Sequence, residues 1–272
     1  SDAQEVELGI TVDQQIRQQY KIALPDDPIS EWAVQLVTPL EEGSVNFRDP
    51  SDIDGYKVAV IVDDALVNAF AAPGGFTYIS TGLIIQSNNC GEIAGVMGHE
   101  LGHVTERHGV KSIEVKYGAA VISEWFFGEG IANDVAQGLF GIVAQTQFSQ
   151  EAESESDEVG LQVAFNAGYN PYGLVAFFAK LLELQGGPQP PSFLSSHPAT
   201  QDRIEAVTAS IEKRYGDAVN PEGTQTYACV GTALTLDQIK SRIANQQVTV
   251  DPSTGLGATD TDSAASAQPE EE

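Results

Sequence analysis

The chain has 272 residues, of which 42% are hydrophobic, enough to build one substantial core. Its 13 basic and 39 acidic residues give a formal net charge of −26, which argues against binding to nucleic acid and to anionic membrane surfaces. No charge-free apolar run reaches the length of a membrane span. The closest stretch, residues 118–147, is interrupted by three acidic residues and is predicted to form a helical hairpin instead.

Helical periodicity dominates the chain, and few segments have the composition of strands. The predicted helices cover about residues 3–20, 28–39, 89–108, 112–146, 149–167, 171–185 and 199–215. Residues 56–62 and 66–71 are apolar and are predicted to be strands, with a Pro-Gly-Gly break after the second. This pattern predicts one α+β, mainly helical domain over residues 1–245. Residues 246–272 are predicted to form an acidic, disordered tail, because large apolar residues almost vanish there.

Residues 99–103 of the third predicted helix read His-Glu-Leu-Gly-His, which fits the pattern His-Glu-x-x-His. Four residues on a helix make about one turn, so His99 and His103 project from the same face and can bind one Zn²⁺ ion. Glu100 lies beside them, where it can act as a general base on a metal-bound water. A chance match on an ordinary helix is the alternative.

The ends of this helix decide whether another histidine can join the same metal. Asn89 is a plausible N-cap, with Glu92 three residues later, and Gly109 supplies a stop signal. On a continuous helix His108 lies about half a turn out of phase with His99. We therefore predict that His108 packs or forms hydrogen bonds and is not a ligand.

The helix predicted over residues 149–167 offers the third protein ligand that zinc requires. Helical phase places Glu153 and Asp157 on the face that otherwise carries small and apolar residues, away from a polar stripe. Carboxylates on such a face are costly unless something compensates them. We predict that Glu153 is the third ligand and that Asp157 accepts the free ring N–H of His99. A capping or surface-charge role for both acids is the alternative.

These motifs resemble those of the gluzincin metallopeptidases. More narrowly, they are similar to the family that includes the HtpX protease, the CAAX prenyl endopeptidase, the mitochondrial OMA protease and periplasmic lipoprotein peptidases. The resemblance covers roughly residues 5–215 and is carried by the segments 68–75, 81–83, 99–103, 148–160 and 196–204. Two positions depart from the family pattern. Gln150 stands where the family usually has Arg, and Ser156 where it usually has Ala.

The resemblance implies a zincin-like fold with one zinc ion per chain and a small β-sheet whose edge strand lies above the active-site helix. It also implies that His197 lies near the zinc, either as a donor to the oxyanion or in the fourth metal position. Arg203 would support the site or bind substrate carbonyls. An ordinary loop histidine and a surface ion pair are the alternatives that the residues leave open.

The same resemblance makes Asn68, Ala69, Phe70 and Ala71 the substrate-binding strand. An unpaired sheet edge can hold an extended peptide by backbone hydrogen bonds, which suits peptides and unfolded proteins as substrates. A plain internal strand without a substrate role is the alternative.

The predicted function is a zinc-dependent endopeptidase that acts on unfolded or extended protein segments. The alternatives are a zinc-containing chaperone-like protein and a regulatory binding protein, each with latent or no peptidase activity. The family resemblance implies a soluble, periplasmic or otherwise extracytoplasmic protein of quality control, whose signal or lipoprotein leader has been removed. Peripheral membrane association, the oligomeric state and pairing of Cys90 with Cys229 stay open.

Overall fold

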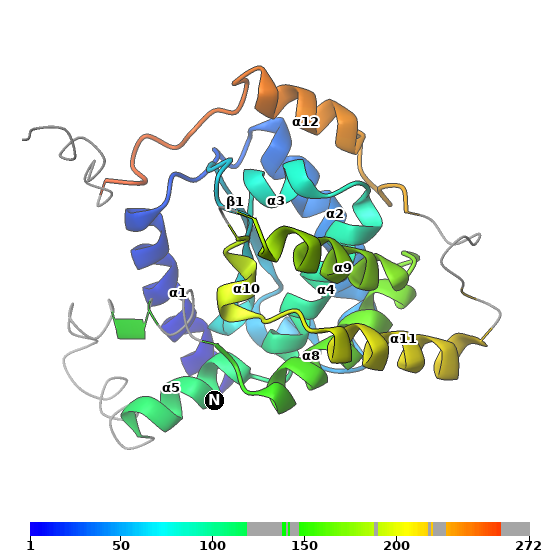
Figure 1. The fold of residues 1–272 in the computed structure, drawn as a ribbon. Coiled ribbons are helices and arrows are strands. Elements are labelled where there is room, and N and C mark those ends of the chain that lie inside the picture. Colours follow the sequence, from blue (N-terminus) through cyan, green and yellow to red (C-terminus); the bar gives the residue numbers. More distant parts are fainter. Residues whose placement is uncertain are drawn as a thin grey trace, which may run out of the picture.

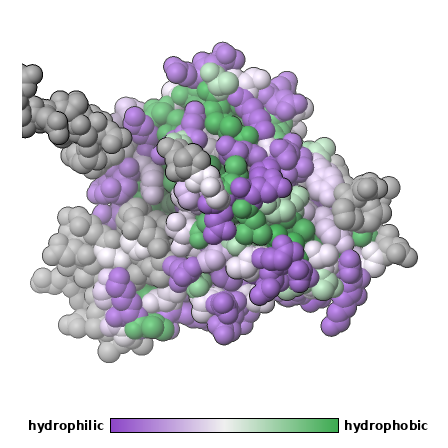
Figure 2. Space-filling model, viewed as in Figure 1, coloured by the Kyte–Doolittle hydropathy of each residue, from purple (hydrophilic) through white to green (hydrophobic). Residues whose placement is uncertain are grey.

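The computed structural model in Figure 1 describes residues 1–118, 138–139, 141, 147–187, 190–216, 219 and 227–256. Most of this part of the chain is helical, as predicted for a mainly helical α+β protein. None of the described helices is both long and apolar enough to cross a membrane. On the face shown in Figure 2, hydrophilic side chains of the described residues surround smaller hydrophobic areas.

Two helices come first along the sequence, followed by a small three-stranded sheet and then by further helices, of which α4 is the central one. In chain order they are α1 (Asp2–Gln19), α2 (Pro28–Ser44), η1 (Pro50–Ile53), β1 (Lys57–Ile61), β2 (Ala69–Ala72), η2 (Pro73–Gly75), β3 (Phe76–Ser80), α3 (Thr81–Gln86), α4 (Cys90–Thr105), α5 (His108–Tyr117), α8 (Gln150–Asn166), α9 (Tyr172–Gln185), α10 (Phe193–Ser196), α11 (Gln201–Tyr215) and α12 (Leu236–Ala244).

The sheet has three strands in the order β1-β3-β2, so β2 is an edge strand, as expected for its sequence segment. β1 runs parallel to β3, and β2 pairs with β3 in the antiparallel sense through the turn η2. Gly74 and Gly75 both have positive φ in that turn, which glycine adopts without steric cost. β3 was not among the predicted strands, although all five of its residues are buried.

Helix α4 lies at the centre of the described helices and contacts α2, α8 and α9 (Figure 1). All of its residues are buried. It begins as predicted, with the Asn89 side chain accepting a hydrogen bond from the backbone N–H of Glu92. A helix that is buried all round must have close neighbours on every side, and glycines make one of these contacts very close.

The contact between α4 and α8 depends on glycines of both helices. A Cβ atom on Gly98 would lie 2.9 Å from the carbonyl oxygen of Gly160, and one on Gly102 would lie 2.8 Å from Cα of Ser156. A Cβ atom on Gly160 would lie 2.7 Å from the backbone nitrogen of His99. The absence of these side chains lets the two backbones approach, and this approach sets the distance between the acids of α8 and the histidines of α4.

Several predicted boundaries are corrected. Helix α4 ends at Thr105, because Arg107 adopts the left-handed region with φ 59° and ψ 33°. A new helix, α5, starts at His108, so Gly109 lies inside a helix and is not a stop. The predicted hairpin over residues 118–147 lies almost entirely outside the described residues.

The C-terminal segment is held against the domain. Cys229 forms a disulfide with Cys90 at the start of α4, a pairing that the sequence left open. Beyond the expected boundary at residue 245, Val250 pairs with Ala23, and Thr254 accepts a hydrogen bond from the backbone of Ile22. The described part of the segment after residue 245 therefore contacts the domain. The division at residue 245 remains a prediction, and residues 257–272 lie outside the described residues.

The glycine contact gives the first testable prediction. Gly160→Ala should lower the free energy of unfolding by about 1–3 kcal/mol, because the new methyl group must push α4 and α8 apart. Gly186→Ala is the matched control, since a Cβ atom there meets nothing within 4 Å and its φ is −79°. Urea unfolding followed by circular dichroism measures both. Equal stabilities for the two variants would contradict this view of the helix contact.

Candidate metal centre

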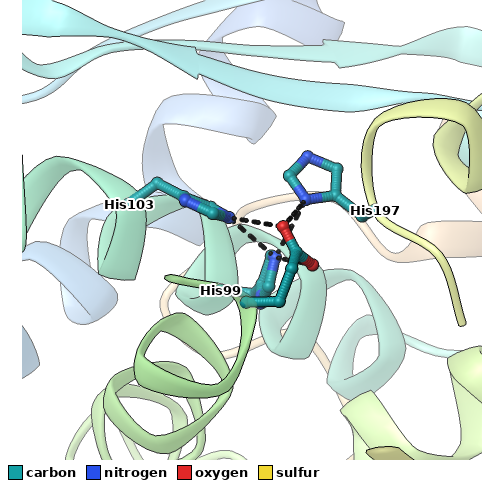
Figure 3. Close-up of side chains that lie close together, drawn as sticks. His99, His103 and His197 are labelled. Atoms are coloured by element: carbon teal, nitrogen blue, oxygen red, sulfur yellow. Dashed lines mark hydrogen bonds and ion pairs between the residues drawn. The ribbon is translucent and has the colours of Figure 1, made fainter. Parts of the chain in front are cut away.

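The two histidines of α4 lie one turn apart and face the same point. Their Nε2 atoms are 3.1 Å apart, and both side chains are buried (Figure 3). Phe148 stacks on the ring of His103 with 4.1 Å between the ring centroids. Helical spacing alone explains the common face, and close packing restricts the orientation of the rings.

Helix α8 brings a carboxylate to the same point. Oε1 of Glu153 lies 3.4 Å from Nε2 of His103, and Oε2 lies 3.6 Å from Nε2 of His99. The helical-phase argument is confirmed here, because Glu153 and Asp157 are buried whereas Glu151 and Glu155 of the same helix are exposed. The close contact between α4 and α8 brings the Glu153 carboxylate to the histidines of α4.

His197 reaches the cluster from the junction between α10 and α11. Its Nδ1 atom lies 2.8 Å from Oε1 of Glu153 and 3.2 Å from Nε2 of His99 (Figure 3). Its other nitrogen, Nε2, lies 3.4 Å from Oε1 of Glu100. The Phe193 ring stacks on it, and the Phe193 backbone N–H donates to the carbonyl oxygen of Val67 just before the edge strand.

The four groups form a donor set that suits a metal ion. One donor atom from each of His99, His103, Glu153 and His197 lies within 4.8 Å of every other. Four ligands bound about 2.0–2.1 Å from a tetrahedral zinc ion would lie about 3.3 Å from one another, close to the separations seen here. Nitrogen and carboxylate oxygen are ligands that zinc binds readily.

The hydrogen atoms of the cluster point to the same conclusion. Nδ1 of His99 lies 2.9 Å from Oδ1 of Asp157, and a proton on this nitrogen would leave Nε2 with a lone pair. That lone pair faces the ring nitrogens of His103 and His197. Lone pairs that converge in a buried space repel one another unless a proton or a metal cation lies between them.

The buried charges also call for a cation. Among the described residues, the carboxylates of Glu100, Glu153 and Asp157 lie near one guanidinium, that of Arg203, and are buried. Burial lowers the pKa of His197, but Glu100 and Glu153 outweigh it and raise that pKa, which offsets part of the negative charge. Oε1 of Glu100 makes no hydrogen bond among the described residues. A divalent ion would neutralise the excess negative charge, which is otherwise expensive to bury.

The pKa values of the cluster follow from burial and mutual charge. Burial raises the pKa of Glu100 above its ordinary value, although His197 and His99 oppose this. Burial would also raise the pKa of Glu153, but His197, His103 and His99 outweigh it and lower that pKa. Burial holds the pKa of His103 well below its ordinary value, so this ring is neutral and able to bind a metal.

Arg203 joins the two acids of α8, which extends its predicted supporting role. It donates to both oxygens of Asp157 at 2.9 and 2.7 Å, and its Nη1 lies 2.7 Å from Oε2 of Glu153. Burial opposes ionisation of Asp157, but His99 and Arg203 outweigh it and lower its pKa. This places Asp157 between a metal-facing histidine and a cation, as an anchor for both.

His108 lies outside the donor set, as predicted, although the reason differs. Its Nδ1 atom is 3.0 Å from Nδ1 of His103, and its Nε2 atom is 3.0 Å from Oε2 of Glu155. The prediction assumed one continuous helix, whereas the break at Arg107 turns His108 back beneath the end of α4. Hydrogen bonding, one of the two roles expected for it, is confirmed.

The predicted substrate strand lies beside α4, with Asn68, Ala69, Phe70 and Ala71 all buried. The Phe70 ring packs in the core, stacked on Tyr78 with 4.9 Å between centroids, so its side chain points away from the site. The backbone N–H of Ala71 donates a hydrogen bond to the carboxylate of Glu100. Any contact with substrate would therefore come from the backbone here, and this role remains a prediction.

The fold and the buried donor set together define a metallopeptidase domain. The chain belongs to peptidase family M48, whose sequence pattern matches residues 37–211, more than half of its length. The predicted resemblance is thereby confirmed.

Three relatives illustrate the similarity. The chain is 31% identical over 148 residues to the mitochondrial metalloendopeptidase OMA1 of Arabidopsis thaliana, and 31% identical over 157 residues to the Beta-barrel assembly-enhancing protease of Escherichia coli K12. It is 34% identical over 158 residues to the metalloprotease LoiP of Escherichia coli K12. These matches cover 54%, 53% and 56% of this chain, and 30%, 32% and 60% of the relatives. The chain thus spans about a third of the length of the first two.

The anchor role of Asp157 is testable by acid titration of stability. Asp157→Asn should lower the free energy of unfolding at pH 7 by about 1.5–3 kcal/mol, because charge-assisted hydrogen bonds to Arg203 are lost. The folded-state pKa of Asp157 is below that of the unfolded chain, about 3.9. The stabilisation is therefore complete above that pH and disappears as pH falls through the folded-state pKa.

Urea unfolding of the wild type and the variant between pH 7 and acid pH measures this effect. Asp26→Asn, at an exposed position, is the control and should leave stability nearly unchanged. A wild-type advantage that stays constant down to acid pH would show that the carboxylate does not act as described.

Proposed function

We propose that this chain is a zinc-dependent endopeptidase that hydrolyses peptide bonds in extended or unfolded protein segments. The observation that carries the proposal is the convergence of three imidazole nitrogens and one carboxylate beside a buried glutamate, in a member of peptidase family M48. The names of the relatives, a metalloendopeptidase, a protease and a metalloprotease, support this reading.

His99, His103 and Glu153 would hold the zinc ion, which when bound supplies Lewis-acid chemistry that makes water a better nucleophile and the scissile carbonyl a better electrophile. Glu100 would take the proton from the attacking water and later give it to the leaving amine. Its raised pKa suits both transfers, because a base with a pKa nearer neutrality can also act as an acid.

The Ala71 amide would orient Glu100 by donating to its carboxylate. This contact ties the base to the edge strand on which we propose the substrate lies. A peptide added to the free edge of β2 would bind by main-chain hydrogen bonds, with little dependence on its sequence. Extended or unfolded segments fit this mode best, since their backbone groups are free.

His197 is proposed to act in two arrangements. As described, its Nδ1 atom belongs to the donor set, which fills a position that a catalytic zinc site leaves open for water or substrate. This arrangement corresponds to a latent enzyme. If the α10–α11 junction moved outward, the position would open, and His197 could then donate a hydrogen bond to the oxyanion.

The setting of the protein is part of the proposal. The disulfide between Cys90 and Cys229 supports an oxidising compartment, such as the periplasm or another extracytoplasmic space. One relative is named for its part in β-barrel assembly, which fits a role in protein quality control outside the cytoplasm. Unfolded envelope proteins would be the substrates in such a compartment.

One observation favours a second function. Glu100, His103, Glu153 and His197 are each at most 3% exposed, so these side chains offer little contact surface to a peptide. A chaperone-like protein that binds unfolded chains only through its edge strand would not need these buried side chains to be exposed. Cleavage of casein by the zinc-loaded protein, and its loss with a chelator, would decide for the peptidase.

Metal content tests the ligand assignment. Glu153→Ala should reduce bound zinc from about one ion per chain to a small fraction, because it removes one of three assigned ligands and unbalances the charges of the site. Glu151→Ala is the control on the same helix, since that residue is exposed. Elemental analysis of both purified variants gives the answer, and full zinc in Glu153→Ala would exclude Glu153 as a ligand.

The role of Glu100 is tested by separating metal binding from turnover. Glu100→Gln should retain zinc and lose peptidase activity by about 10²–10⁴-fold, because an amide cannot accept the proton of water. Fluorogenic peptide cleavage measures the loss, and elemental analysis checks the metal. A variant with full activity would remove Glu100 from the mechanism.

A further inference from the structure

The metal-facing ring of His103 has a second buried histidine behind it. Its Nε2 atom lies in the donor set, whereas its Nδ1 atom lies 3.0 Å from Nδ1 of His108. Both residues are only 3% exposed, so water does not readily replace this contact. The contact alone does not show which histidine is the donor, because either ring nitrogen of a neutral histidine can carry the proton.

Counting hydrogen atoms removes the ambiguity. A neutral histidine that binds a metal through Nε2 must carry its proton on Nδ1. The Nδ1–H of His103 then donates to His108, whose own Nδ1 must be a lone pair. The proton of His108 is therefore on Nε2, where Oε2 of Glu155 lies 3.0 Å away and can accept it.

We infer that His108 and Glu155 are positioning residues that hold the His103 ring in the tautomer and orientation needed to bind the metal. The inference rests on the proposed zinc site and extends it to two residues that touch neither metal nor substrate. Glu155 accepts a hydrogen bond from Nε2–H of His108, which leaves Nδ1 of His108 as an acceptor. His108 can then accept the Nδ1–H of His103. This series of hydrogen bonds thus starts at the Glu155 carboxylate, which is 56% exposed, and ends at the buried ring of His103.

The backbone conformation places Glu155, His108 and His103 so that these two hydrogen bonds, here called the relay, can form. The left-handed residue Arg107 breaks the helix so that His108 begins α5 and folds back toward His103. Glu155 lies two residues after Glu153 on α8, on the other side of that helix from the assigned ligand, and its Oε2 atom lies 3.0 Å from Nε2 of His108. Outer hydrogen-bond partners of this kind orient a metal ligand, and their loss typically weakens metal binding by about 10–100-fold.

Ser156 offers a competing hydrogen bond and therefore a useful control. Its Oγ atom lies 3.2 Å from the same Nδ1 atom of His108, so its hydroxyl can donate to the lone pair that His103 uses. Removing this hydroxyl leaves the relay intact. Ser156→Ala should therefore bind zinc at least as tightly as the wild type.

The test compares zinc affinity among variants of the full chain, by competition with a chromogenic chelator. His108→Phe keeps a ring of similar size but has no acceptor, and should bind zinc about 10–100-fold more weakly. His108→Asn places an amide oxygen near the position of Nδ1 and should recover most of that affinity. Glu155→Ala should give an intermediate loss, because the proton position of His108 is no longer fixed.

Nitrogen-15 NMR of the zinc-loaded wild type gives a second, direct readout. We expect the ring proton of His103 on Nδ1 and that of His108 on Nε2. The inference is overturned if the His108 proton is on Nδ1, or if His108→Phe and Glu155→Ala bind zinc as tightly as the wild type. If His108→Phe does not fold, Glu155→Ala and the NMR spectra decide. A wild type that binds no zinc would instead overturn the proposed function.

Discussion

The close contact between α4 and α8 is the constraint on which the rest of the site depends. Each helix alone presents only part of a metal centre, two histidines on one and a carboxylate on the other. Glycines at the crossing allow backbone-to-backbone approach, as the 2.7 Å distance from a Cβ on Gly160 to the His99 nitrogen shows. Side chains at these positions would clash with the facing backbone and push the two helices apart.

This approach creates an electrostatic problem that the surrounding residues partly solve. Three carboxylates lie buried together, and among the described residues Arg203 is the permanent cation that contacts two of them. The guanidinium of Arg203 donates hydrogen bonds to both oxygens of Asp157 and forms an ion pair with Glu153, so both carboxylates are held in fixed orientations. The remaining negative charge and the converging imidazole lone pairs favour a bound divalent ion.

The same burial bears on how activity could be controlled. The junction that carries His197 is fastened to Val67, next to the edge strand, by the Phe193 backbone and the Ser192 hydroxyl. Movement of this junction would therefore free the metal position and the start of the strand together. A single displacement would couple access for substrate to release of the fourth donor.

Much of the site could be predicted because its signals are local. The spacing of His99 and His103 fixes their common face, and helical phase separates Glu153 and Asp157 from the exposed acids of α8. At His108 the predicted role was right, but the assumption of one continuous helix was wrong, because Arg107 in the left-handed region turns the chain. Strand β3 was also missed, although four of its five residues, Phe76 to Ile79, are of types that favour strands.

The sequence by itself determined the helix with the His-Glu-x-x-His pattern, the candidate third ligand, the order of the motifs and the family. Tertiary structure alone decided that His197 lies inside the donor set, that Arg203 bridges two acids, that Cys90 pairs with Cys229 and that His108 contacts His103. Those contacts join residues far apart in the chain or across a helix break. Periodicity reports which side chains share a face of one element, but it carries no information on which faces meet.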